Sequence, residues 1–209
     1  MCKRMFFSIL FIGLRGILFS QASEIPDLSI PVANGDIFYV NKQLNPKEEI
    51  LSLDQQTLIK YLNIAIDYGQ YPMIDYLLSN YDIDNQANKG VLIATKDQRV
   101  DIVRLLLSYG FTANLGDEDG ISPLMISIYD DNKVLFELLM NADSDLNHQD
   151  KFGMTPLMVA SYLGYPDYVE ILLAKEADKS ITDKDGKTAL DYALMKEDQY
   201  MIDVLEGGS

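Results

Sequence analysis

The sequence repeats itself every 33 residues, and this period restricts the possible fold more than any other feature. Four kinds of position keep it: a Ser or Thr before Pro-Leu or Ala-Leu, a Gly two residues earlier, a small residue in the segment that follows, and an apolar residue further on. These positions are Ser122, Thr155 and Thr188; Gly120, Gly153 and Gly186; Ala94, Ser127, Ala160 and Ala193; and Val103, Phe136, Val169 and Ile202. A unit of this length cannot bury its apolar face alone, so the period predicts units stacked in a solenoid.

One unit, residues 152–173, shows how each residue serves the local fold. Thr155 can accept a hydrogen bond from the free N–H groups of a first helical turn. Pro156 suits the first position of that helix, where the missing N–H costs nothing. Gly164 can take the left-handed conformation that ends the helix, and Pro166 can begin a second one. We therefore expect Thr155 to be a helix cap and not a nucleophile.

This pattern resembles the ankyrin repeat. The motif of that family runs D-x-x-G-x-T-P-L-H-x-A-x-x-x-G, then a Leu-rich helix and a loop rich in Gly, Asp and Asn, and residues 150–178 match it best. The resemblance covers roughly residues 28–207, about the whole of the expected mature chain. It implies an all-α repeat solenoid of helix-turn-helix units with β-hairpin-like loops, about five to six repeats long, with a degenerate N-terminal cap.

Some positions depart from the family's motif. Met125, Met158 and Asp191 stand in place of the His that holds the loop by hydrogen bonds in the family. We expect these repeats to lose that bracing and the hairpins to be less rigid. The second repeat has Lys89-Gly90-Val91 in place of Thr-Pro-Leu, so its first turn should be less well capped.

The chain divides into seven predicted segments. They are a signal peptide (1–22), an N-terminal segment with a divergent capping repeat (23–53), four repeats (54–84, 85–116, 117–149 and 150–182) and a C-terminal capping repeat (183–209).

The first 22 residues are typical of a secretory signal. Lys3 and Arg4 precede an apolar run, and Ser20 and Ala22 offer small residues before a cleavage site. The run is too short for a transmembrane helix, which needs about 20 residues. We expect export to the periplasm or secretion, without membrane insertion after cleavage; an uncleaved anchor and a cytosolic chain are the alternatives.

Charge and residue types argue against several functions. A net charge of −15 argues against nucleic-acid binding, which needs clustered Lys and Arg. A catalytic triad or a His-ligated metal site would have to use His148, the only histidine. Residues 143–147 resemble the start of a calcium loop, but His148 and Met154 stand where that loop needs Gly and Glu. We expect no enzyme, no cofactor and no metal.

The resemblance also implies contact residues, which in this family flank the Thr-Pro-Leu and lie near the end of the first helix. The matching positions are Tyr68, Asp97, Asp119, Ile121, Tyr129, Asp130, Phe152, Met154, Tyr162 and Leu163. Tyr129 and Tyr162 lie 33 apart and should stack side by side on a concave face. Asp97, Asp119 and Asp130 should favour a basic partner. The alternative is that some of these tyrosines only fill gaps between repeats.

These observations lead to a functional hypothesis. We expect a monomeric, non-catalytic module of the bacterial envelope that binds a protein partner through its concave surface. Two alternatives use the same scaffold: an immunity or inhibitor protein against an envelope-targeted toxin, and a secreted effector that binds host proteins.

Overall fold

The computed structural model describes residues 27–44, 54–86 and 88–207, and these residues form twelve α-helices. The helices are α1 (Ser29–Ala33), α2 (Ile37–Leu44), α3 (Gln55–Asp67), α4 (Tyr71–Asn80), α5 (Gly90–Lys96), α6 (Val100–Ser108), α7 (Pro123–Tyr129), α8 (Lys133–Met140), α9 (Pro156–Leu163), α10 (Pro166–Ala174), α11 (Ala189–Met195) and α12 (Gln199–Glu206). None of the described residues is in a β-strand. The predicted signal peptide lies outside the described residues, as do 23–26 and 45–53 of the N-terminal segment.

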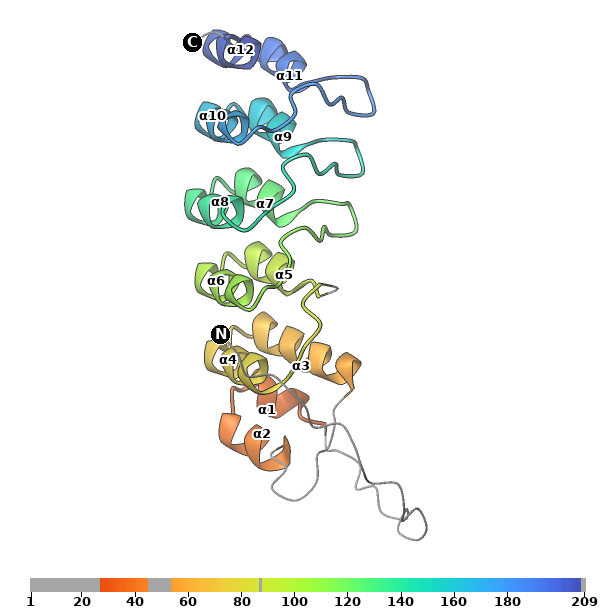
Figure 1. Cartoon of the computed structure of the whole chain (residues 1–209), viewed down its shortest axis with the longest axis vertical. Coiled ribbons are helices and arrows are strands. Elements are labelled where there is room, and N and C mark those ends of the chain that lie inside the picture. Colours follow the sequence, from red (N-terminus) through yellow and green to blue (C-terminus); the bar gives the residue numbers. More distant parts are fainter. Residues whose placement is uncertain (1–26, 45–53, 87, 208–209) are drawn as a thin grey trace, which may run out of the picture.

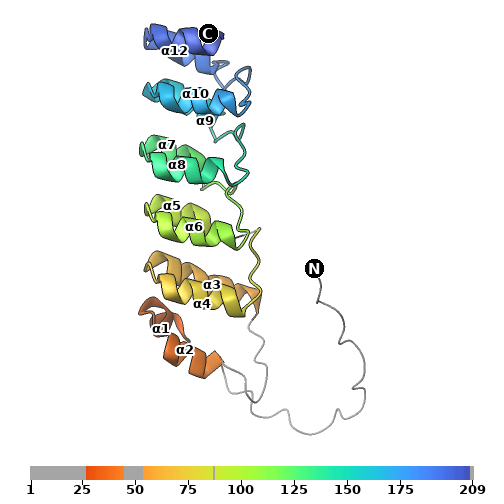
Figure 2. The same cartoon turned by 60° about the vertical axis from the view of Figure 1, so that its left-hand side comes forward.

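Six helix pairs stack in chain order into one column (Figure 1). The first helix of each pair, here called the inner helix, packs against the inner helices of its neighbours; the second, or outer, helices form a parallel column. The loops before α7, α9 and α11 project as hairpins to one side of the column (Figure 1), and the turns within each pair lie at the opposite edge (Figure 2). The all-α repeat solenoid expected from the sequence is confirmed, while the boundaries between repeats stay a prediction.

The small residues of the 33-residue period lie where the inner helices meet. Ala94, Ser127, Ala160 and Ala193 have no exposed surface, and the contacts within the inner column are closer than those within the outer column. A short side chain at this position lets two helix backbones approach each other. The period thus marks the closest contacts of the solenoid.

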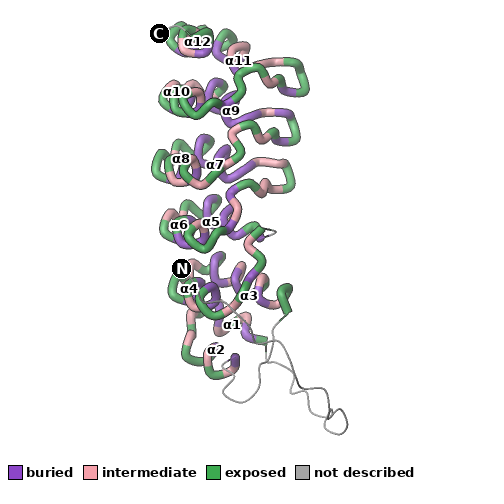
Figure 3. The backbone as a smooth tube through the Cα atoms, in the orientation of Figure 1, coloured by how far each residue is buried: buried purple, intermediate pink, exposed green. Residues whose placement is uncertain are grey.

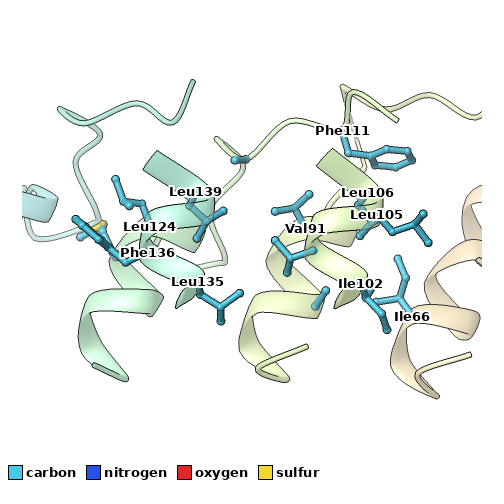
Figure 4. Close-up of a cluster of buried hydrophobic side chains, with 14 of the residues drawn as sticks. Ile66, Val91, Ile102, Leu105, Leu106, Phe111, Leu124, Leu135, Phe136 and Leu139 are labelled. Carbon is cyan, nitrogen blue, oxygen red and sulfur yellow. The ribbon is translucent and has the colours of Figure 1, made fainter. Parts of the chain in front are cut away.

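The apolar core runs along the whole stack (Figure 3). Apolar side chains of inner helices, such as Val91 and Leu124, belong to the same buried cluster as those of outer helices, such as Leu135, as Figure 4 shows for α5 to α8. Phe136 meets Tyr168 of the next outer helix edge to face, with 4.6 Å between ring centroids. Each pair buries its apolar face against the next, which is the arrangement the period predicted.

The predicted helix caps are present. The Thr155 hydroxyl accepts a hydrogen bond from the Met158 N–H at 3.3 Å, and Ser122 does the same for the Met125 N–H. Gly164 ends α9 with φ +80°. As expected for the second repeat, Lys89 makes no side-chain cap at the start of α5.

A residue with positive φ stands between the two helices of every pair and gives the pairs a common register. These residues are Gly35, Gly69, Gln98, Asp131, Gly164 and Glu197.

The three hairpins are fixed by one aspartate each, in the same register. Asp150 Oδ1 accepts hydrogen bonds from the Phe152 and Met154 N–H groups at 2.8 and 2.9 Å. Asp117 and Asp183 accept the equivalent bonds in the other two hairpins.

Neighbouring hairpins are also joined to each other. The Lys151 N–H donates to the Asp119 carbonyl at 2.7 Å, and the Lys184 N–H to the Phe152 carbonyl at 3.0 Å. His148 Nε2 lies 2.6 Å from the Gly120 carbonyl oxygen.

The expectation of lost bracing is wrong for the last repeat. Asp191 Oδ2 accepts hydrogen bonds from the N–H and the hydroxyl of Thr188, both at 2.7 Å. An aspartate side chain therefore supplies the acceptor that we expected this repeat to lack.

Candidate functional site

The predicted contact residues fall into two groups at opposite ends of the inner helices. Asp119, Ile121, Phe152 and Met154 belong to the hairpins, and the others lie at or just after the ends of inner helices: Tyr68, Asp97, Tyr129, Asp130, Tyr162 and Leu163. Between the groups, residues 122–128 and 155–161 are all buried. A partner that crosses this side of the stack would therefore contact mainly the helix ends and the hairpins.

One register position at the helix ends changes character along the stack. It is charged in the second and third pairs and apolar in the last three, being occupied by Asp67, Lys96, Tyr129, Tyr162 and Met195. The side chains of Tyr129 and Tyr162 are 41% and 47% exposed. Tyr129, Tyr162 and Met195 are here called the apolar row, because they expose large side chains at equivalent positions of α7, α9 and α11.

Tyr162 contacts a different ring from the one predicted. Its ring meets Tyr192 edge to face, with centroids 5.8 Å apart, and the Lys196 ammonium lies 5.0 Å from its centroid. Tyr162 is near enough to Tyr129 to act on it electrostatically: burial, then Asp150 and Tyr162, raise the pKa of the Tyr129 phenol. The two tyrosines are thus neighbours along the row, with Tyr192 as the ring that contacts Tyr162.

Tyr192 was not among the predicted site residues. Its hydroxyl donates to Asp183 Oδ2 at 2.5 Å, and the Lys187 ammonium lies 5.7 Å from its ring centroid. Burial, followed by the Asp183 carboxylate, raises the pKa of this phenol. Tyr192 thus connects the last hairpin to Tyr162. The signal in the sequence was an aromatic residue at a register position that is Ile or Val in the earlier repeats, from Ile30 to Val159.

The hairpin group exposes one large apolar side chain. Phe152 is 61% exposed and stands at the tip of its hairpin, with the Lys151 ammonium 4.9 Å from its ring centroid. Ile121 and Met154 are partly buried and pack against the core. Phe152 is therefore the member of this group with most apolar surface to offer.

Each of the three predicted acidic contacts already has a partner within the chain. Asp97 lies 3.5 Å from the Arg99 guanidinium, and Asp119 lies 2.6 Å from the Lys151 ammonium. Asp130 accepts a hydrogen bond from Gln98 at 2.5 Å. The local attraction for a basic partner is therefore weaker than the sequence implied.

Asp67 adds an unfavourable charge beside Asp97. Burial, then the Asp97 carboxylate, raises its pKa, and the nearby Arg99 opposes this. Asp67, at the register position that the apolar row occupies in later pairs, is thus a carboxyl group that the fold does not stabilise in its ionised form.

The described residues offer few groups for catalysis. Among residues 27–44, 54–86 and 88–207, no three His, Cys, Asp or Glu side chains are grouped so as to hold a metal ion. His148 is partly buried, with its Nε2 at the Gly120 carbonyl. In the same ranges, no helix is both long and apolar enough to cross a bilayer.

Two family models match the chain. One, described as ankyrin repeats (3 copies), covers residues 62–150, and the other, ankyrin repeats (many copies), covers residues 138–193. A comparison with curated proteins gives no match. The two matches together span most of the described stack and include all three hairpins. The chain belongs to the ankyrin-repeat family, whose repeats are typically non-catalytic and generally serve as protein–protein interaction modules.

Proposed function

We propose that this protein binds a protein partner through the apolar row, with Phe152 at the edge of the contact. The observation that carries the proposal is the change along one register position, from Asp67 and Lys96 to Tyr129, Tyr162 and Met195. Tyrosine is enriched where proteins meet, because its ring buries apolar area while its hydroxyl still finds a polar partner. Large side chains exposed on three successive repeats offer a contiguous anchor for another protein.

The surroundings of the row favour binding because they are already ordered. The ring of Tyr192 packs edge to face against that of Tyr162, and the Tyr192 hydroxyl is held by a hydrogen bond to Asp183. The hairpins at the other ends of the inner helices are held by Asp117, Asp150 and Asp183. A surface that is rigid before binding loses less conformational entropy when the partner arrives.

Charge favours a basic partner mainly at long range. The net charge of −15 attracts such a partner over distances up to about the Debye length, near 8 Å at physiological salt. At contact distance the carboxylates Asp97 and Asp119 are paired, and Lys187 and Lys196 lie beside the tyrosines. Salt should therefore slow association more than it speeds dissociation.

A matched pair of variants tests the site. The protein and its Tyr129→Ala/Tyr162→Ala variant are used to capture partners from native extract, with Val134→Ala/Ile171→Ala as a control that removes exposed apolar side chains from the outer helices α8 and α10. We expect one prominent partner to be lost with the tyrosines and kept by the control, and its Kd to rise at least tenfold in titration. Equal retention by all three proteins would contradict the apolar row as the binding site.

The compartment in which the chain acts distinguishes between the cellular roles open to it. We infer export from residues 1–22, and place the protein in the periplasm, where it binds an envelope protein. An immunity or inhibitor protein would instead bind one enzyme tightly, one to one, and block its activity; an effector would be found in the medium and bind host proteins. Fractionation into periplasm, medium and cytosol shows where the chain is found, and its molecular mass there shows whether residues 1–22 have been removed. An activity assay on the captured partner separates an inhibitor from a scaffold.

A further inference from the structure

Two register positions in each helix pair face the preceding pair. Tyr192, five residues before the positive-φ residue of the last pair, contacts the ring of Tyr162 in the pair before it. Tyr168, four residues after the positive-φ residue of its pair, contacts Phe136 in the pair before it. Side chains at these two positions therefore point toward the N-terminal end of the stack.

Both positions are covered in every pair except the first. The position of Tyr168 is buried in all five later pairs, as Met73, Ile102, Leu135, Tyr168 and Met201. The position of Tyr192 is buried or partly buried in the same pairs, as Ile64, Ile93, Ile126, Val159 and Tyr192. In the first pair these positions are Tyr39 and Ile30, which are 40% and 73% exposed, and Phe38 beside them is 82% exposed.

Ile30, Phe38 and Tyr39 are here called the N-terminal face. They lie on α1 and α2, the pair at one end of the column (Figure 2). Ile30 and Tyr39 have the residue types and the register of a stacking interface, while Phe38 stands at a position that is exposed in the later pairs as well. Among the described residues, no preceding pair covers this face. We propose that a second copy of this chain covers it through its own N-terminal face, so that two stacks join end to end as a two-fold symmetric dimer.

The proposed contact would repeat the packing that already joins neighbouring helix pairs within the stack. Helix pairs of this chain already bury aliphatic and aromatic side chains at these two positions against another pair of the same chain. Terminal repeats of a solenoid normally present a polar outer face, and an exposed Ile and Phe do not meet that requirement. Aromatic anchors of this kind are enriched in interfaces between proteins.

Charge and symmetry favour the N-terminal face as the partner over the other end of the stack. Leu194 at the C-terminal end is also exposed at a position that the earlier pairs bury. However, residues 189–207 around it hold five acids and one Lys, whereas residues 27–44 hold only Asp27, Asp36 and Lys42. A contact between unlike ends would also not close and would grow into filaments, while a contact between like ends closes as a dimer.

The dimer differs from the monomer expected from the sequence and is independent of the apolar row. Sedimentation velocity of the full chain over a wide concentration range tests it, with Ile30→Glu and Leu194→Glu as variants of equal charge at the two ends. A third variant, Ile30→Ser/Phe38→Ser, removes apolar surface without adding charge. Both altered N-terminal residues are well exposed, so the fold should persist, which thermal melting followed by circular dichroism checks.

We expect the wild type to dimerise reversibly, the dimer Kd to rise at least tenfold in Ile30→Glu and in the Ser variant, and Leu194→Glu to match the wild type. A wild type that is monomeric at every concentration would overturn the proposal, since the face would then be covered within the chain or left open. Association that survives Ile30→Glu, or that is lost in Leu194→Glu, would overturn it as well.

Discussion

The last three repeats and the earlier ones hold their connecting loops in different ways. Before α7, α9 and α11, an aspartate inside the loop binds two N–H groups of the same loop. The loop before α5 is held both from inside and from outside: Asp84 Oδ1 accepts from the Gln86 N–H at 2.9 Å, while Gln55 of α3 accepts from the Asp84 N–H at 2.9 Å and donates to the Asp82 carbonyl at 2.5 Å. In the hairpins one aspartate binds two N–H groups of its own loop, whereas the earlier loop shares its bracing with a helix of its neighbour.

This difference concerns function because Phe152, on one of the hairpins, belongs to the proposed contact together with the apolar row. A loop with an aspartate of its own depends less on its neighbours for its shape, although backbone hydrogen bonds also join neighbouring hairpins. The sequence of the last three repeats can therefore change at exposed positions, such as Phe152, without loss of the scaffold beneath. The free energy of unfolding of variants with substitutions in the hairpins measures how rigid these loops are.

The largest effect is expected at Gly153 in the hairpin before α9. Its φ is +83°, and a Cβ there would lie 2.9 Å from Lys184 N and 3.0 Å from the Asp183 Cα of the next hairpin. Gly153→Ala should lower the free energy of unfolding by about 3 kcal/mol, since the left-handed backbone costs roughly 1–2 kcal/mol for Ala and the clash adds to it. Urea unfolding measures the change.

Gly164→Ala is the control for that variant. Gly164 has φ +80°, but a Cβ there meets nothing within 4 Å, so only the backbone cost of roughly 1–2 kcal/mol applies. Equal losses in the two variants would mean that the neighbouring hairpin moves away easily, and the hairpins would then be no more rigid than ordinary loops.

A smaller loss is expected when a hairpin loses its aspartate. Asp150→Ala leaves the Phe152 and Met154 N–H groups without their acceptor, and hydrogen bonds to a charged group contribute roughly 1.5–3 kcal/mol. We expect about 2 kcal/mol lost in urea unfolding. Asp119→Ala, which breaks a half-exposed ion pair with Lys151, should cost under about 1 kcal/mol. If Asp119→Ala cost as much as Asp150→Ala, the role given to Asp150 would be refuted.

The helix caps offer a comparison between repeats. Thr155→Ala removes the hydroxyl that accepts from the Met158 N–H, and should cost about 1 kcal/mol. Lys89 stands at the same point of α5 and makes no cap, so Lys89→Ala should leave the unfolding midpoint unchanged. A loss at Lys89 similar to that at Thr155 would show that the second repeat is capped in another way.

Much of the fold could be predicted because its signals are local. The caps at Ser122 and Thr155 and the left-handed Gly164 each depend on one turn of chain, and the 33-residue period is the recurrence of such local signals. These signals fixed the class of fold and the direction of each helix pair. They needed no knowledge of what lies next to each repeat.

The site was harder to predict because its contacts join residues of different repeats. The acids looked free in the sequence, yet Asp119 is paired with Lys151 and Asp130 with Gln98, each about one repeat away. Tyr192 was not singled out in the sequence, and only the packing of the last two pairs brings it against Tyr162. The exposure of Tyr129 and Tyr162 followed from the resemblance, but the ring contact of Tyr162 with Tyr192 did not.

The smallest expected effect concerns two carboxyl groups whose pKa values move in opposite directions. Hydrogen bonds from the Thr188 N–H and hydroxyl lower the pKa of Asp191, while burial and Asp97 raise that of Asp67. Asp191 therefore stabilises the fold above its unfolded pKa of about 3.9, and this contribution disappears as the pH falls through its folded pKa. Asp67 has the opposite sign, since its contribution is present at low pH and is lost as the pH rises through its raised pKa.

Urea unfolding at neutral pH should thus give Asp191→Asn a lower free energy of unfolding than the wild type, and Asp67→Asn an equal or higher one. Both differences should shrink as the pH falls, that of Asp67→Asn before that of Asp191→Asn, because the pKa of Asp67 is raised and that of Asp191 is lowered. If Asp67→Asn destabilised the protein at neutral pH, the ionised Asp67 would stabilise the fold through Arg99. The charged residues at this register position, Asp67 and Lys96, would then be as well ordered as the apolar row.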